Sequence, residues 1–260
     1  MKLKYYLIIL FLFLLPTLTL AYSTHGKILR AKAEKTLGLN YYYGRNGVKQ
    51  NYSKAVYWFR KAAFQGNADG QSHLGTAYDL GHGVKQNYSK AVYWFRKAAF
   101  QGNAYAQAEL GYDYHLGRGV KQNYSKAAFW FRKAAARGNT IAQVNLGSAY
   151  YSGRGVKQNY SKAVYWFRKA AFQGNADGQS HLASAYYLGR GVKRNYSKAA
   201  YWFKKAAVRG NTDGQLGLGI AYYLGRGVKE NYSKAVYWLK KAAVQGNKNA
   251  RTLLNKIEQR

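Results

Sequence analysis

The chain has 260 residues, 48% hydrophobic and 17% aromatic, so it is long and apolar enough to form a packed core. It contains no Cys, which excludes disulfides, Cys-based metal sites and a thiol nucleophile. Its 42 Lys and Arg stand against 9 Asp and Glu, and the formal charge of +33 favours acidic partners: protein, nucleic acid, anionic glycan or anionic lipid.

Residues 1–21 have the pattern of an export signal. A start with two Lys precedes the apolar run Tyr5–Leu15, and the small residue Ala21 provides a cleavage position. We therefore expect a signal peptide and an exported mature protein, periplasmic or secreted, that begins near Tyr22. The alternative is an uncleaved membrane anchor through residues 5–21, at the short limit for a spanning helix.

The rest of the chain repeats with a period of 36 residues. A block that begins with Gly-Val occurs without change at 47–68, 83–104 and 155–176, and all six Trp fall on the same 36-residue grid. A period of this length predicts structural repeats that stack on their neighbours.

Each repeat is predicted to form two helices. In the first repeat, Asn51 is placed to cap a helix over 52–65, which ends where Gly66 supplies a left-handed residue. A second helix is expected from about residue 69 to residue 80, ending at Gly81. One such hairpin cannot bury its apolar faces alone, so we expect an all-α solenoid of αα-hairpins that forms a right-handed superhelix.

Turning the first helix at 100° per residue separates a buried arc from an exposed one. The arc expected in the core holds Trp58, Phe59, Val56, Ala55, Ala62 and Ala63. Small residues at Ala62, Ala63, Gly70 and Gly75 should allow the two helices of a repeat to approach closely.

The ends of the chain are expected to differ from the middle. Residues 22–46 form an N-terminal cap or partial repeat, in which Tyr41 corresponds to Tyr78. The repeat array covers 47–246, and a polar capping helix covers 247–260.

The repeat resembles the Sel1-like repeat, a relative of the tetratricopeptide repeat. The resemblance implies an αα-superhelix that serves as a non-catalytic scaffold for protein interactions, in bacteria often exported and linked to envelope or host-contact processes. The chain departs from the family pattern because the capping Asp is Asn in all six units and the usual Glu after the Lys-Ala-Ala run is apolar. The residues that carry the resemblance are Leu110, Gly111, Tyr114, Gly117, Gly119, Val120, Asn123, Lys126, Ala127, Trp130, Phe131 and Arg132–Ala135.

The exposed arc of the first helices is the candidate partner-binding face. It repeats Lys, an aromatic residue and Lys in every unit, and in tetratricopeptide-like arrays the first helices line the concave side. We expect a basic, tyrosine-rich groove there that binds an acidic protein or peptide. The candidate residues are Lys54, Tyr57, Lys61, Lys90, Tyr93, Lys97, Lys126, Phe129, Lys133, Lys162, Tyr165, Lys169, Lys198, Tyr201 and Lys205.

Other positions provide a contrast to this face. Lys85, Lys121 and Lys157 are expected at outer or loop positions away from the groove. The outer positions of the second helices vary between units, as in Asp79 and His115, whereas recent duplication alone would preserve both arcs equally. The competing interpretation is that the Lys and Tyr recur only because the repeats were recently duplicated, and that Tyr57 merely covers a neighbouring unit.

Three function classes stay open. The first is the non-catalytic scaffold, and the second is a binder of anionic glycan, lipid or, less favoured, nucleic acid. The third is a cell-wall-related, β-lactam-binding enzyme, as described for disulfide-rich relatives, although no motif of this Cys-free chain carries that role.

The five His show no metal-binding spacing, so no catalytic residue, metal or cofactor is expected. The Asn-Tyr-Ser sequons are interpreted as helix caps, with glycosylation as the alternative.

Overall fold

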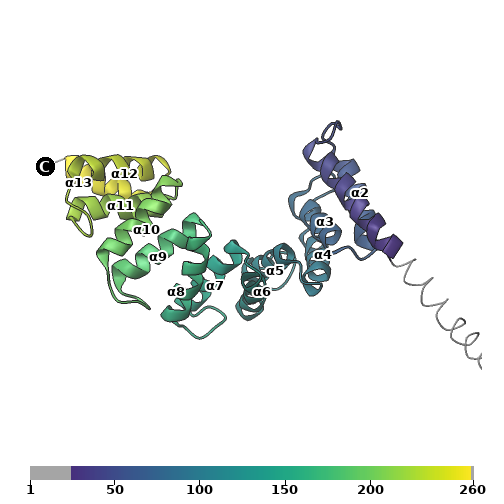
Figure 1. Cartoon of the computed structure of the whole chain (residues 1–260), viewed down its shortest axis with the longest axis horizontal. Coiled ribbons are helices and arrows are strands. Elements are labelled where there is room, and N and C mark those ends of the chain that lie inside the picture. Colours follow the sequence, from purple (N-terminus) through teal and green to yellow (C-terminus); the bar gives the residue numbers. More distant parts are fainter. Residues whose placement is uncertain (1–24, 259–260) are drawn as a thin grey trace, which may run out of the picture. The chain divides into compact units, whose positions relative to one another are not determined.

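The computed structural model describes residues 25–258, and the expected signal segment 1–21 lies outside them (Figure 1). The described residues form thirteen helices and no strand, which confirms the all-α class. No helix among them is long and apolar enough to cross a membrane.

The amino-terminal helix covers residues 25–43. The others are α2 (Tyr52–Phe64), α3 (Ala68–Leu80), α4 (Tyr88–Phe100), α5 (Ala104–Leu116), α6 (Tyr124–Ala136), α7 (Thr140–Ser152), α8 (Tyr160–Phe172), α9 (Ala176–Leu188), α10 (Tyr196–Val208), α11 (Thr212–Leu224), α12 (Tyr232–Val244) and α13 (Lys248–Glu258).

The described chain consists of two compact units. The first unit runs to Asp113 and includes Gly117–Lys121, and the second comprises Tyr114–Leu116 and the chain from Gln122 onward. In each unit a first helix contacts its own second helix and the second helix of the preceding repeat, as α8 contacts α9 and α7. In the second unit α9 also contacts α7 and α11, so second helices of adjacent repeats approach one another. This pattern confirms a solenoid of stacked hairpins.

The helix ends follow the capping residues that the sequence predicts. The Oδ1 atom of Asn51 accepts a hydrogen bond of 2.9 Å from the backbone N–H of Lys54, and Asn67 caps the second helix in the same way. Gly66 and Gly81 take the left-handed conformation, with φ of 85° and 75°. The observed bounds, Tyr52–Phe64 and Ala68–Leu80, differ from the predicted ones by one residue.

The core is made of the phenylalanines, leucines and alanines of each repeat. Phe59 is 1% exposed and packs with Leu74 and Ala55, as predicted. Four of the six tryptophans lie further out than the sequence suggested. Trp58, Trp166, Trp202 and Trp238 are only half-buried, whereas Trp94 and Trp130 are buried.

Small residues allow close packing, within one repeat at Gly70, as predicted, and between successive repeats at Gly75, which was expected to act within its own repeat. A Cβ atom on Gly75 would lie 2.6 Å from the ring of Phe95, and a Cβ atom on Gly70 would lie 2.7 Å from the Cβ of Ala62. The two glycines therefore leave the space that the neighbouring helices occupy.

Buried glutamines link successive repeats. Gln143 donates from Nε2 to the backbone carbonyl of Ala135 at 3.2 Å, and its Oε1 accepts from Gln173 of the next repeat at 2.9 Å. Gln215 and Gln245 repeat the second bond at 2.8 Å. These bonds satisfy carbonyl groups at the ends of the first helices while joining neighbours.

The two ends of the array differ from its middle. The backbone carbonyl of Tyr41 accepts a 2.8 Å bond from Asn51, as Tyr78 does from Asn87, so the helix over 25–43 stands where a second helix would. The extra residue before the next repeat is accommodated by Asn46, whose φ of 54° is left-handed. At the other end, α13 packs through Ala250 and Leu254 and exposes polar residues such as Arg251, Thr252 and Lys256.

Candidate functional site

The outer arc of the first helices is exposed, as the sequence predicts. Tyr57 is 52% exposed and Phe64 is 74% exposed, although both are large apolar side chains. Tyr93, Phe129, Tyr165 and Tyr201, the copies of Tyr57, are exposed to a similar degree. An aromatic surface that recurs on every first helix is typical of an interaction surface rather than of random exposure.

The lysines at the position of Lys61 lie over aromatic rings of their own helix. The Nζ atom of Lys61 is 4.7 Å from the ring centroid of Tyr57 and 5.0 Å from that of Trp58. In the other repeats the corresponding distances to the ring of the residue four positions earlier lie between 4.8 and 5.7 Å, for Lys97, Lys133, Lys169 and Lys205. Each of these ammonium groups is held by a cation–π contact near an exposed ring.

The lysines at the position of Lys54 lie over a different ring, that of a tyrosine from the preceding second helix. Lys54 stands 5.4 Å from the centroid of Tyr41, and Lys90 stands 5.5 Å from that of Tyr78. The same contact is made by Lys126 with Tyr114, by Lys162 with Tyr150 and by Lys198 with Tyr186. This tyrosine was expected only as a matching position of the repeat, although its occurrence in every unit is a signal that could have identified it.

In three repeats an arginine of the preceding first helix also contacts this tyrosine, at its hydroxyl group. Arg132 of α6 donates from Nη2 to the hydroxyl of Tyr150 at 3.3 Å, while Lys162 of α8 covers the ring. Arg60 with Tyr78 (3.4 Å) and Arg168 with Tyr186 (3.5 Å) repeat this arrangement. Each tyrosine therefore lies between cations from two successive first helices.

One such site, in the second unit, is a groove with a cavity of about 420 Å³ lined by Arg132, Tyr150, Lys157 and Lys162. Val156, Gln158 and Asn159 complete its wall. The expectation that Lys157 lies away from the candidate face is therefore wrong: the loop before α8 brings it into the same groove as Lys162. Lys157 and Lys162, which were expected on separate surfaces, therefore line one groove.

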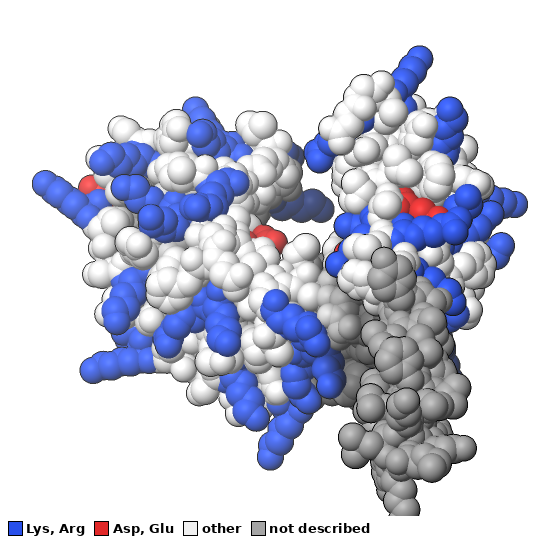
Figure 2. Space-filling view, turned by 45° about the vertical axis from the view of Figure 1, so that its right-hand side comes forward, with Lys and Arg blue, Asp and Glu red and all other residues white. Residues whose placement is uncertain are grey.

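No carboxylate within residues 25–258 forms an ion pair with Arg132, Lys157 or Lys162. Figure 2 shows the wider imbalance, with Lys and Arg spread over the described surface in view and Asp or Glu at few points. Like charges that share a groove repel one another, so an anion that enters the groove relieves this repulsion.

Three carboxylates, those of Asp79, Glu109 and Asp113, lie close together in the first unit. Arg118 lies 3.5 Å from Asp113 and 3.8 Å from Asp79. Burial raises the pKa of Asp113 to about 7, and burial likewise raises the pKa of Glu109. No group of His, Asp or Glu among the described residues has the geometry of a metal site. Asp79 and Asp113 therefore pair with an arginine of their own unit, although Nε of Arg118 and one oxygen of each carboxylate are buried without a hydrogen-bond partner.

Comparison with known proteins agrees with the geometry of the helix pairs. A family model, the Sel1 repeat, matches residues 31–67, 68–103, 104–139, 140–175, 176–211 and 212–247. The chain belongs to the Sel1 repeat family. Sel1 repeat proteins are generally non-catalytic scaffolds for protein interactions.

Solved structures include close relatives of these Sel1 repeats. A protective antigen present in uropathogenic Escherichia coli strains, which displays an SLR fold, is 40% identical with a TM-score of 0.79. The match covers 87% of this chain but 48% of the antigen, so the chain spans about half of that protein. A Sel1 repeat protein from Oxalobacter formigenes is 36% identical with a TM-score of 0.74, and the match covers 82% of this chain and 84% of that one. None of the curated proteins matches the chain.

Proposed function

We propose that this Sel1 repeat protein is a non-catalytic scaffold that binds an acidic segment of a partner protein along its first helices. The observation that carries the proposal is the groove at Tyr150, where Arg132 and Lys162 share one ring and no carboxylate of the described chain pairs with either. Carboxylate side chains of a partner would supply the missing negative charge, one groove at a time.

The exposed aromatic residues favour a protein partner over a simple polyanion. Tyr165 and Phe172 are exposed on α8, the helix that carries Lys162, and Phe172 makes an edge contact with Trp202 of the next repeat at 5.3 Å. Rings in such positions offer apolar contact area that a peptide can cover and that a sugar sulfate or phosphate chain uses less well. The concave placement of these helices stays a prediction.

The test compares two double variants in the second unit that remove the same charge. Lys162→Gln with Lys198→Gln removes the lysines over Tyr150 and Tyr186, whereas Arg190→Gln with Arg226→Gln removes cations on the second-helix side. Fluorescence anisotropy with a labelled Glu-rich peptide, and with its Gln counterpart, measures binding at several salt concentrations.

We expect the lysine variant to lose at least about tenfold in affinity, equivalent to about 1.4 kcal/mol, and the arginine variant to lose much less. Binding should weaken as salt rises, because exposed charges are screened. Equal losses would make the protein a diffuse polycation, and no loss in either variant would reject the groove. Tighter binding of a heparin fragment than of the Glu peptide at equal charge would favour the polyanion alternative.

We also propose that the protein is exported through residues 1–21 and acts in the envelope or outside the cell. The support is the sequence pattern of a basic start, the apolar run Tyr5–Leu15 and Ala21. Amino-terminal sequencing of the exported protein should give a start near Tyr22. Recovery of a cytosolic chain that still begins at Met1 would contradict export.

A further inference from the structure

The second-helix side of the repeats carries a series of side-chain pairs between neighbours. The loop after each second helix contributes a basic residue, which reaches the outer residue at the end of the preceding second helix. His82 and Tyr42 share a hydrogen bond of 2.8 Å between Nδ1 and the hydroxyl. Arg118 forms an ion pair of 3.8 Å with Asp79. In the second unit, Arg190 donates to the hydroxyl of Tyr151, and Arg226 donates to that of Tyr187.

One member of the series lacks its partner. Arg154 corresponds to Arg118 and Arg190, but the residue it faces is His115, which takes the position of Asp79 or Tyr151. No hydrogen bond joins His115 to Arg154, and the Arg154 guanidinium has no acceptor among the described residues. Its nearest aromatic contact is the ring of Tyr124 at 5.9 Å.

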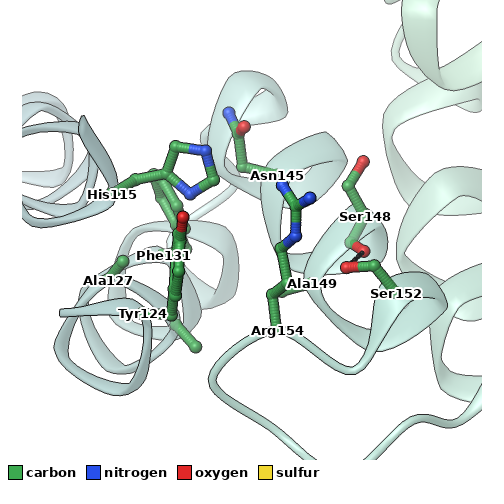
Figure 3. Close-up of a pocket in the computed structure, with 10 residues that line it drawn as sticks. His115, Tyr124, Ala127, Phe131, Asn145, Ser148, Ala149, Ser152 and Arg154 are labelled. Carbon is green, nitrogen blue, oxygen red and sulfur yellow. Dashed lines mark hydrogen bonds between the residues drawn. The ribbon is translucent and has the colours of Figure 1, made fainter. Parts of the chain in front are cut away.

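A pocket of about 220 Å³ opens at this position in the second unit. Figure 3 shows Arg154 rising into it between His115 and Tyr124 on one side and Ser148 and Ser152 on the other. The space exists because α7 has small residues here: Ser152 stands where Leu80, Leu116, Leu188 and Leu224 stand in the other second helices. The pocket is smaller than a drug-sized site and fits a single side chain.

The charge of the pocket indicates what it can hold. Burial, and then the neighbouring Arg154, lower the pKa of His115, so the imidazole is neutral at pH 7. The pocket therefore carries the single positive charge of Arg154, whose planar guanidinium suits two oxygen acceptors. A monoanionic carboxylate matches this charge better than a dianionic phosphate does.

We propose that this pocket is a second binding site, separate from the first-helix grooves, which takes the carboxylate of an acidic side chain from a partner protein. The chain itself contains the model for the contact, because Asp79 provides a carboxylate to Arg118 at the same position of the preceding repeat. Where His115 replaces that Asp, the repeat offers no carboxylate to the exposed Arg154, and a partner's side chain can supply one.

The test uses NMR shift titration of the isotope-labelled chain with a short, end-blocked peptide that holds one Glu, and with its Gln twin. The Glu peptide should shift the amide signals of Ser148, Ser152 and Arg154 and the imidazole of His115, and the Gln peptide should not. Titrations with acetate alone and with inorganic phosphate run beside them. Acetate that reproduces the local shifts would identify free carboxylates as the source, whereas a response limited to the Glu peptide would identify a protein side chain.

Matched variants make the test decisive. Arg154→Gln should weaken binding of the Glu peptide at least tenfold, whereas Arg190→Gln, which removes the same charge from the next repeat, should change it less than twofold. His115→Tyr introduces the side chain found at Tyr151 and Tyr187 and should keep the fold while abolishing binding, because its hydroxyl would take the guanidinium. Equal effects of the two Arg variants, unchanged binding by His115→Tyr, or stronger shifts with phosphate than with acetate would overturn the proposal.

Discussion

At the scale of single residues, the buried glutamines show how one substitution changes a repeat interface. Gln143 and Gln215 each accept a bond from a glutamine of the next repeat. Gln179 stands at the same position, but the residue that would donate to it is Arg209, and its Oε1 atom is buried without a partner. A buried acceptor without a donor costs free energy that the interfaces at Gln143 and Gln215 avoid.

Arg209→Gln is therefore expected to stabilise the protein. The new side chain can donate to Oε1 of Gln179 as Gln173 does to Gln143, with a gain of about 0.5–1.5 kcal/mol in the free energy of unfolding. Denaturant titration measures the change. Arg209→Met is the control, because it removes the same charge without providing a donor. A gain that is equal in both variants would attribute the effect to charge repulsion instead.

At the scale of the helices and their connections, the glycines of the Gly-Val pairs from Gly83 onward lie against the start of the preceding first helix, whereas Gly47 has open space around it. Gly155 has a φ of 74°, and a Cβ atom there would collide with the backbone carbonyl of Tyr124 at the start of α6. Gly138, between α6 and α7, has a φ of 89° but open space around it. Both glycines have a left-handed backbone, but only Gly155 lies directly against the backbone of another helix.

Comparing Gly155→Ala with Gly138→Ala separates these two effects. Gly138→Ala should cost about 1–2 kcal/mol for the left-handed conformation alone. Gly155→Ala should cost about 1–3 kcal/mol more, because the methyl group also overpacks the contact with α6. The free energies of unfolding of the two variants provide the measurement. If both variants lose the same amount, close approach has no role at Gly155.

The elements themselves could be predicted from the sequence, because their signals are local. Asn51 and Gly66 act on the backbone of their own helix, and both were located correctly. The groove could be predicted only in part, because its ring, Tyr150, and its third cation, Lys157, come from elements before the first helix that carries Lys162. Spacing along one helix does not show which neighbouring side chains close over it.

At the scale of the whole molecule, each repeat is stabilised by its neighbours. In the second unit the first helices contact second helices on both sides. Disruption of a repeat in the middle of the array therefore weakens two interfaces, whereas disruption of the last repeat weakens one. Stability should therefore depend on where in the array a core residue is removed.

Two tryptophan substitutions test this dependence. Trp130→Ala removes a buried side chain within the array and should cost about 3–5 kcal/mol. Trp238→Ala removes a half-buried one beside the last repeat and should first reduce hydrogen-exchange protection in α12 and α13. Equal loss of protection over the whole chain in both variants would contradict nearest-neighbour stabilisation.

The identical blocks at 83–104 and 155–176 make some helix interfaces interchangeable. Removal of residues 83–154 would place α8 against α3, and because α8 has the same sequence as α4, the new junction would reproduce the existing contact between α3 and α4. Recombination between the repeated coding segments can therefore shorten or lengthen the array by whole repeats, and the new junction would reproduce a helix contact that the chain already contains. Array length, and with it the number of grooves offered to a partner, is open to rapid evolutionary change.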